Sequence, residues 1–156
     1  MYDLHHDLLD ALNATPETLT GLLAGVSQAQ AQSARGGDEN WSVVEVVCHL
    51  REAEEISLQR TIAMRDQDVP QIIGYDQEAY ARDRDYRHTD LRTALAAFAA
   101  YRKQHLAVLA ALRPEQWQRS GEHNEFGRIA IFEMIIHKTS HDAIHCAQIA
   151  RQLSAE

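Results

Sequence analysis

Apolar residues recur at intervals of three and four positions in four long stretches of the chain, which is the spacing of amphipathic helices. We expect these helices at about residues 2–27, 42–65, 89–112 and 128–153. The last three have about 24 residues each, or roughly 36 Å of helix, a length that suits a bundle. No alternating pattern is long enough to predict a strand. The sequence therefore predicts an all-α fold, a single-domain four-helix bundle over residues 1–156.

The start of the second helix carries the clearest local signal. Ser42 and Glu45 have the spacing of a capping box, in which each side chain accepts a hydrogen bond from the other residue's backbone N–H. Trp41 and Val46 flank the box where a hydrophobic staple would pack. We therefore expect the helix to begin at residue 42 or 43.

The connections are polar and differ in length. Residues 28–39 contain two glycines and are expected to form a loop, as are residues 120–127. The long connection between the second and third helices, residues 66–88, contains Pro70 and Gly74 and has room for a short helix near 77–82. A connection of this length is often functional, for example as a lid over a site.

Proline also predicts a break within the first helix. Thr15 and Pro16 lie in its middle. Because proline is favoured in the first turn of a helix and threonine at its cap, we expect a break or kink near Ala14.

Composition and charge narrow the function classes. The chain is 45% hydrophobic and 24% charged, as in ordinary globular proteins. Its 15 basic and 23 acidic residues leave a net charge of −8, which argues against nucleic-acid binding. Two cysteines make no disulfide framework, and neither a signal peptide nor a membrane-spanning stretch is evident, so we expect a cytoplasmic protein without a membrane partner. Nine histidines in such a chain need an explanation.

Three of these histidines have the spacing and setting of metal ligands. His141 and His145 lie four residues apart, and therefore on one face of the fourth helix, where two imidazoles can converge on one ion. His49, in an apolar stretch of the second helix, is the best third candidate. Three imidazoles would leave a coordination position open for water or substrate, as in catalytic sites. We expect a divalent ion, Zn or Ni, with Fe or Mn as alternatives, because ligand type alone does not select the metal.

The same segments resemble the DinB-like (DinB/YfiT) superfamily of four-helix metalloproteins. The resemblance rests on Trp41–Leu50, which opens the second helix, and on His137–Ile149 in the fourth. It implies an up-down-down-up bundle, frequent homodimers, and a divalent metal held by His49, His141 and His145. Some relatives are metal-dependent thiol S-transferases or thiol-dependent isomerases. Ala147 stands where relatives often carry glycine.

Other residues near the three histidines have weaker claims. Glu52 and Gln148 are catalytic candidates: Glu52 as a base one turn from His49, and Gln148 as a group that orients water. His137 could support a ligand or lie on the surface. Cys48 and Cys146 neighbour the histidines but should point elsewhere, because adjacent helix residues diverge by about 100°.

The arginines of the long connection could hold an anionic substrate or thiol; these are Arg82, Arg84 and Arg87. A solvated face is nevertheless the first expectation for Glu52, as it is for Asp142. The remaining histidines are expected on polar faces or in loops: His5, His6, His88, His105 and His123.

Three function classes remain open on the sequence alone. The first is a metalloenzyme that activates water or a low-molecular-weight thiol for attack on a small-molecule substrate, as a hydrolase or a thiol S-transferase. The second is a non-catalytic, dimeric metal-binding or stress-related bundle. The third is a purely structural helical bundle with incidental histidines, which requires His49 to lie far from His141 and His145.

Overall fold

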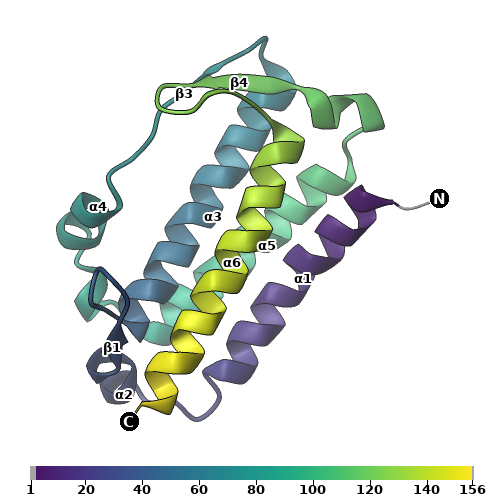
Figure 1. Ribbon diagram of the computed structural model, residues 1–156. Coiled ribbons are helices and arrows are strands. Elements are labelled where there is room, and N and C mark those ends of the chain that lie inside the picture. Colours follow the sequence, from purple (N-terminus) through teal and green to yellow (C-terminus); the bar gives the residue numbers. More distant parts are fainter. Residues whose placement is uncertain (1–2, 156) are drawn as a thin grey trace.

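A computed structural model, which describes residues 3–155, shows a bundle of four long helices. They are α1 (Leu4–Leu22), α3 (Val43–Asp66), α5 (Leu91–Ala110) and α6 (Ile131–Ser154) (Figure 1). α1 packs against α5 and α6, and α3 packs against the same two helices. The predicted all-α four-helix bundle is confirmed.

The long connection follows from the direction of the helices. α3 and α5 pack side by side and run in the same direction, while α1 and α6 run in the opposite one (Figure 1). Because two parallel neighbours cannot be joined by a short turn, the chain between them must return along the length of the bundle. This return segment contains β3 (Gln71–Ile72), the 3-10 helix η1 (Tyr86–His88), and α4 (Gln77–Asp83), where the sequence predicts a short helix.

The capping box at the start of α3 forms as predicted. The Ser42 hydroxyl accepts a hydrogen bond from the backbone N–H of Glu45 at 3.3 Å, and the Glu45 carboxylate accepts one from that of Ser42 at 2.7 Å. Arg35 adds an ion pair to the same carboxylate at 2.8 Å. These contacts fix where α3 begins, and with it the position of His49 two turns later.

The predicted break near Ala14 is wrong, because α1 continues through Pro16. Proline has no N–H, so the carbonyl of Leu12 loses its helical partner. The guanidinium of Arg102 on α5 donates to that carbonyl instead, at 2.6 Å. Thr15 is buried in mid-helix, and its hydroxyl donates to Asp142 on α6 at 3.2 Å. Tertiary contacts thus satisfy the groups that would otherwise favour a break.

Two predicted loops contain regular structure. Within residues 28–39 lie α2 (Gln28–Ser33) and β1 (Arg35–Gly36), which pairs antiparallel with β2 (Trp41–Ser42). The other loop, 120–127, contains β4 (Ser120–His123) and the first residue of β5 (Gly127–Ala130).

The strands β3, β4 and β5 form a small sheet at one end of the bundle (Figure 1). β3 pairs parallel with β4, and β4 pairs antiparallel with β5. Gly121 allows the close approach of β3, since a Cβ there would lie 2.6 Å from Cγ1 of Ile72. The sheet joins the long connection to the segment that precedes α6. The 3-10 helix η2 (Pro114–Gln118) leads into it from α5.

The interior has two apolar clusters with a charged layer between them. One cluster includes Leu50 and Phe98, and the other includes Met64 and Leu109. Two buried charged residues, Glu54 on α3 and Arg102 on α5, fall between these positions. Within the described residues, no helix is long and apolar enough to cross a membrane.

Candidate metal centre

His49, His141 and His145 meet between α3 and α6. One ring nitrogen of each lies within 4.8 Å of those of the other two. The Nε2 atoms of His49 and His141 are 2.9 Å apart. The structure therefore brings together the three histidines that the sequence singles out, although His49 and His141 are 92 positions apart in the sequence.

Burial keeps these imidazoles neutral. Burial, together with the neighbouring His141 and His145, lowers the pKa of His49 to about 2. Burial lowers the pKa of His141 to about 4, and it also lowers the pKa of His145. Neutral imidazole is the form that binds metal, so all three side chains are in their ligating state at neutral pH.

Neighbouring side chains orient the rings. Nδ1 of His145 lies 2.8 Å from Oε1 of Gln148, which can only accept a hydrogen bond. A proton on Nδ1 leaves the lone pair on Nε2 for a metal. Oδ1 of Asp142 lies 3.8 Å from Nδ1 of His141, and the indole of Trp41 packs 5.1 Å from the His49 ring, centre to centre.

The donor set fits a divalent ion. Three neutral imidazoles from two rigid helices match the ligands that Zn²⁺ or Ni²⁺ accepts, and three protein ligands leave a position for an exchangeable one. Neither cysteine belongs to this cluster. Burial raises the pKa of both thiols, that of Cys146 to about 11, so neither is poised as a thiolate.

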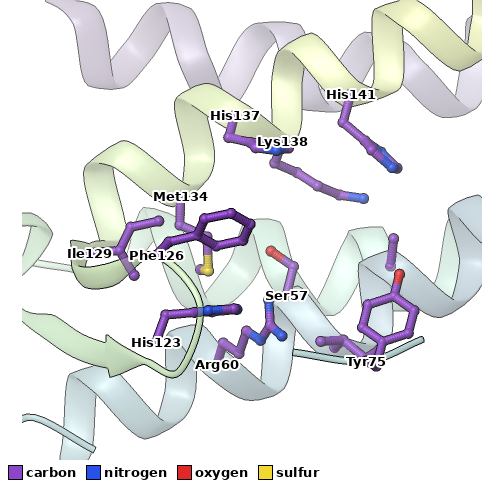
Figure 2. Close-up of a pocket in the computed structure, with 12 residues that line it drawn as sticks. Ser57, Arg60, Tyr75, His123, Phe126, Ile129, Met134, His137, Lys138 and His141 are labelled. Atoms are coloured by element: carbon purple, nitrogen blue, oxygen red, sulfur yellow. The ribbon is translucent and has the colours of Figure 1, made fainter. Parts of the chain in front are cut away.

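A pocket of about 170 Å³ adjoins the site and includes His141 in its wall (Figure 2). Its lining comes from α3, α6, the long connection and the β4–β5 turn. The lining residues are Ala53, Ile56, Ser57, Arg60, Tyr75, His123, Phe126, Ile129, Met134, His137, Lys138 and His141. Tyr75 shows that the long connection covers part of this pocket. The centre therefore has a binding space beside it.

The two catalytic candidates have different surroundings. Glu52 is buried outside the pocket lining, and its carboxylate accepts hydrogen bonds from Tyr86 at 3.1 Å, from Arg51 at 3.3 Å and from Arg84. It ties α3 to the long connection. Gln148 is buried against His145, as described above.

The other polar candidates are divided between the pocket and the surface. His137 is exposed at the pocket rim, its ring 6.2 Å from that of His141. Arg82 pairs with Asp83 in solvent, and the pocket lining includes none of the three arginines of the long connection.

A buried ionic network lies beside the centre and was not predicted from the sequence. Arg102 donates to Glu54 and to Asp142, both at 2.6 Å, and the Lys138 ammonium lies 3.2 and 3.3 Å from the same two carboxylates. Nδ1 of His105 lies 2.8 Å from Glu54. The predictions of a solvated Asp142 and a solvated Glu52 are wrong, as is that of a polar-face His105, because all three are buried.

Helical spacing could have revealed this network. Glu54 follows the core residue Leu50 by four positions, and Arg102 follows Phe98 by four. Charges at core-facing positions of two helices indicate a buried pair. His123 was also expected in a loop without a role; it is buried at the end of β4 and lines the pocket.

The fold and the three-histidine cluster define a helical bundle with a candidate metal centre between two of its helices. Residues 11–149 match the DinB superfamily, and the chain belongs to this superfamily. Among solved structures it is similar to YfiT from Bacillus subtilis, described as a probable metal-dependent hydrolase with an unusual four-helix bundle topology. That match has a TM-score of 0.83 at 21% identity and covers 99% of this chain and 91% of YfiT. A comparison with curated proteins found no match.

Proposed function

We propose that this protein is a metal-dependent hydrolase of small molecules, in which His49, His141 and His145 hold a divalent ion, Zn²⁺ or Ni²⁺. The convergence of three buried, neutral imidazoles beside a pocket carries the proposal. The likeness to YfiT, described as a probable metal-dependent hydrolase, supports it.

The chain's own residues provide binding and orientation. A divalent ion, when bound, supplies Lewis acidity, which polarises a carbonyl and lowers the pKa of water. The three histidines fix its position, and Gln148 keeps His145 in the ligating tautomer. The largely apolar pocket wall would hold a substrate beside His141.

Metal analysis tests the first half of the proposal. Untagged protein reconstituted with Zn²⁺ or Ni²⁺ and then dialysed should retain one ion per chain. His141→Ala should lose it. His88→Ala is the matched control, because His88 is exposed and contacts Asp85 away from the centre. Retention of metal by His141→Ala, or its absence from the reconstituted wild type, would overturn the assignment.

Two further measurements separate hydrolysis from the alternatives. The loaded protein should hydrolyse members of an ester and amide panel, and azide should enter the coordination sphere of a Co²⁺-substituted sample, with a change in its visible spectrum. Turnover only when a low-molecular-weight thiol is added would replace hydrolysis by thiol S-transfer. A closed coordination sphere with no turnover would leave a non-catalytic metal-binding bundle.

We also propose that two copies associate through the outer face of α6. Ile144 on this face is 62% exposed and Ile136 is 39% exposed. Large exposed apolar side chains on one helix favour a protein contact. Light scattering after gel filtration should give the mass of a dimer for the wild type and that of a monomer for Ile144→Asp.

A further inference from the structure

The pocket beside His141 has walls that suit a compact apolar group. Its lining includes the apolar side chains of Ile56, Ile129, Met134 and Phe126, and its volume is about 170 Å³. An apolar cavity of about 150 Å³ is large enough to bind benzene. The body of the ligand should therefore be about the size of one aromatic ring or a short branched chain.

The polar part of the lining carries positive charge, although the chain as a whole has a net charge of −8. Arg60 enters the pocket from α3 and Lys138 from α6 (Figure 2). Among the described residues that line this pocket there is no aspartate and no glutamate. Glu54 and Asp142 lie 3.2 and 3.3 Å from Nζ of Lys138 and offset its charge. Arg60 donates one N–H to the carbonyl of Ile73, at 2.7 Å, and has Glu125, outside the lining, as an acidic neighbour.

Ser57 and Lys138 present buried polar atoms in this lining, in residues that are only 6% and 5% exposed. Within residues 3–155, Oγ of Ser57 has no hydrogen-bond partner, whereas Nζ of Lys138 forms ion pairs with Glu54 and Asp142 at 3.2 and 3.3 Å. A buried donor without a partner is costly, so such atoms in a pocket indicate a place for a ligand oxygen or an ordered water. In Figure 2 both atoms are directed into the space between α3 and α6.

We propose that this pocket binds a small organic carboxylate: a compact apolar body with one carboxylate held by Ser57, Lys138 and Arg60. A carboxylate oxygen accepts from the Ser57 hydroxyl, and the Lys138 ammonium and the Arg60 guanidinium supply positive charge beside it. The apolar body fills the space against Met134 and Phe126. The inference rests on the proposed function, because it names the substrate or product class of the same centre.

The test uses benzoate as the probe, with two partial analogues. Benzamide keeps the ring and removes the charge, and acetate keeps the charge and removes the ring. Calorimetric or NMR titration of the full chain should show that benzoate binds at least tenfold more tightly than either analogue. Equal affinity for benzoate and benzamide would overturn the assignment of an anion site.

Variants locate the site. Arg60→Gln should weaken benzoate binding at least fivefold and leave benzamide binding unchanged, and Arg60→Lys should restore most of the difference because it keeps the charge. Ser57→Ala should weaken benzoate binding about threefold. Arg82→Gln makes the same chemical change at an exposed arginine that pairs with Asp83, so it should have no effect. An equal loss in the Arg60→Gln and Arg82→Gln variants would show a nonspecific charge effect and would contradict the proposal.

One further variant distinguishes benzoate binding in the pocket from metal binding by the histidines. His145 is a candidate ligand but does not line the pocket, so His145→Ala should lose metal and keep benzoate binding. Loss of both would mean that the carboxylate coordinates the ion, which overturns the pocket assignment and leaves the metal centre intact. Selective benzoate binding by a protein that retains no metal would uphold the pocket and refute the proposed function.

Discussion

The Gln148 side chain acts directly on His145: its carbonyl oxygen lies 2.8 Å from Nδ1 of the imidazole. Gln148 is in turn held near the chain's β1 segment, where its amide nitrogen donates to the carbonyl of Gly36 at 3.4 Å. A fixed acceptor at Nδ1 sets both the tautomer and the ring orientation of a metal ligand. The candidate ligand is therefore positioned before any ion binds.

Replacing Gln148 should weaken metal binding without unfolding the protein. We expect Gln148→Leu to lower Zn²⁺ affinity about 10–100-fold, because the His145 ring loses its orienting acceptor. Competition with a fluorescent chelator measures this. The control is Gln152→Leu, which removes a buried glutamine one turn further along α6 that donates to the Trp41 carbonyl at 2.7 Å. Equal metal affinity in the two variants would refute the orienting role of Gln148.

Arg102 should be critical for stability. Its guanidinium is fully buried and contacts Glu54, Asp142 and the Leu12 carbonyl. Arg102→Leu leaves two carboxylates with one remaining cation, and removing one partner from a buried ionic group costs about 3–5 kcal/mol. Urea unfolding of the variant should show a loss of this size.

A surface arginine provides the matched control for that measurement. Arg113 pairs with Glu115 at 2.5 Å, and both side chains are about two-thirds exposed. Such pairs contribute about 0–1 kcal/mol, so Arg113→Leu should unfold at nearly the wild-type urea concentration. Losses of similar size in the two variants would contradict the buried network.

The metal-free protein should lose stability as the pH falls from 7 to 5. Burial lowers the pKa of His49 to about 2 and that of His141 to about 4, whereas an unfolded histidine titrates near 6.5. Below pH 6.5 the unfolded state therefore binds more protons, and the free energy of unfolding falls with pH. Each of these two histidines should account for roughly 1–2 kcal/mol between pH 7 and 5.

Urea unfolding of chelator-treated protein at several pH values measures this dependence. His49→Gln should reduce it by about half, because His141 still contributes, whereas His88→Gln, at an exposed histidine, should leave it unchanged. Above pH 5 the carboxylates of Glu54 and Asp142 stay ionised in the folded state, because their charged neighbours hold both pKa values below the usual range. A wild-type free energy of unfolding that is constant from pH 7 to 5 would refute the prediction.

The small sheet should not tolerate a side chain at Gly121. A Cβ there would lie 2.6 Å from Cγ1 of Ile72 and 3.0 Å from the carbonyl oxygen of Pro70. Gly121→Ala should therefore separate β3 from β4 and cost about 1–3 kcal/mol, as overpacking does. Because β4 carries His123 into the pocket, benzoate binding should weaken as well.

Gly21 is the matched control, since it lies within α1 and a Cβ there meets nothing within 4 Å. Gly21→Ala should leave the protein unchanged or up to about 1 kcal/mol more stable, because alanine favours the helix. If Gly121→Ala were as stable as Gly21→Ala, the close packing of β3 on β4 would be disproved.

The long helices, the helix cap and the three histidines could be predicted from the sequence, because each depends on residues that are close together in the chain. The capping box of Ser42 and Glu45 needs only residues three apart, and the shared face of His141 and His145 needs only the helical repeat. Apolar spacing likewise predicts the four long helices, because each buries one face wherever its neighbours lie. His49 could be proposed as the third partner because it interrupts an apolar face.

Tertiary structure decided what depends on groups distant in the sequence. Pro16 does not break α1, because Arg102, 86 positions away, satisfies the carbonyl that proline leaves free. β3 and β4 are two and four residues long, too short for an alternating pattern, and they form because each supplies the other's backbone hydrogen bonds. The placement of Arg60, Ser57 and Lys138 in one pocket likewise depends on how α3 packs against α6. Spacing along a helix determines which side chains share a face, and only the packing of the helices determines what that face meets.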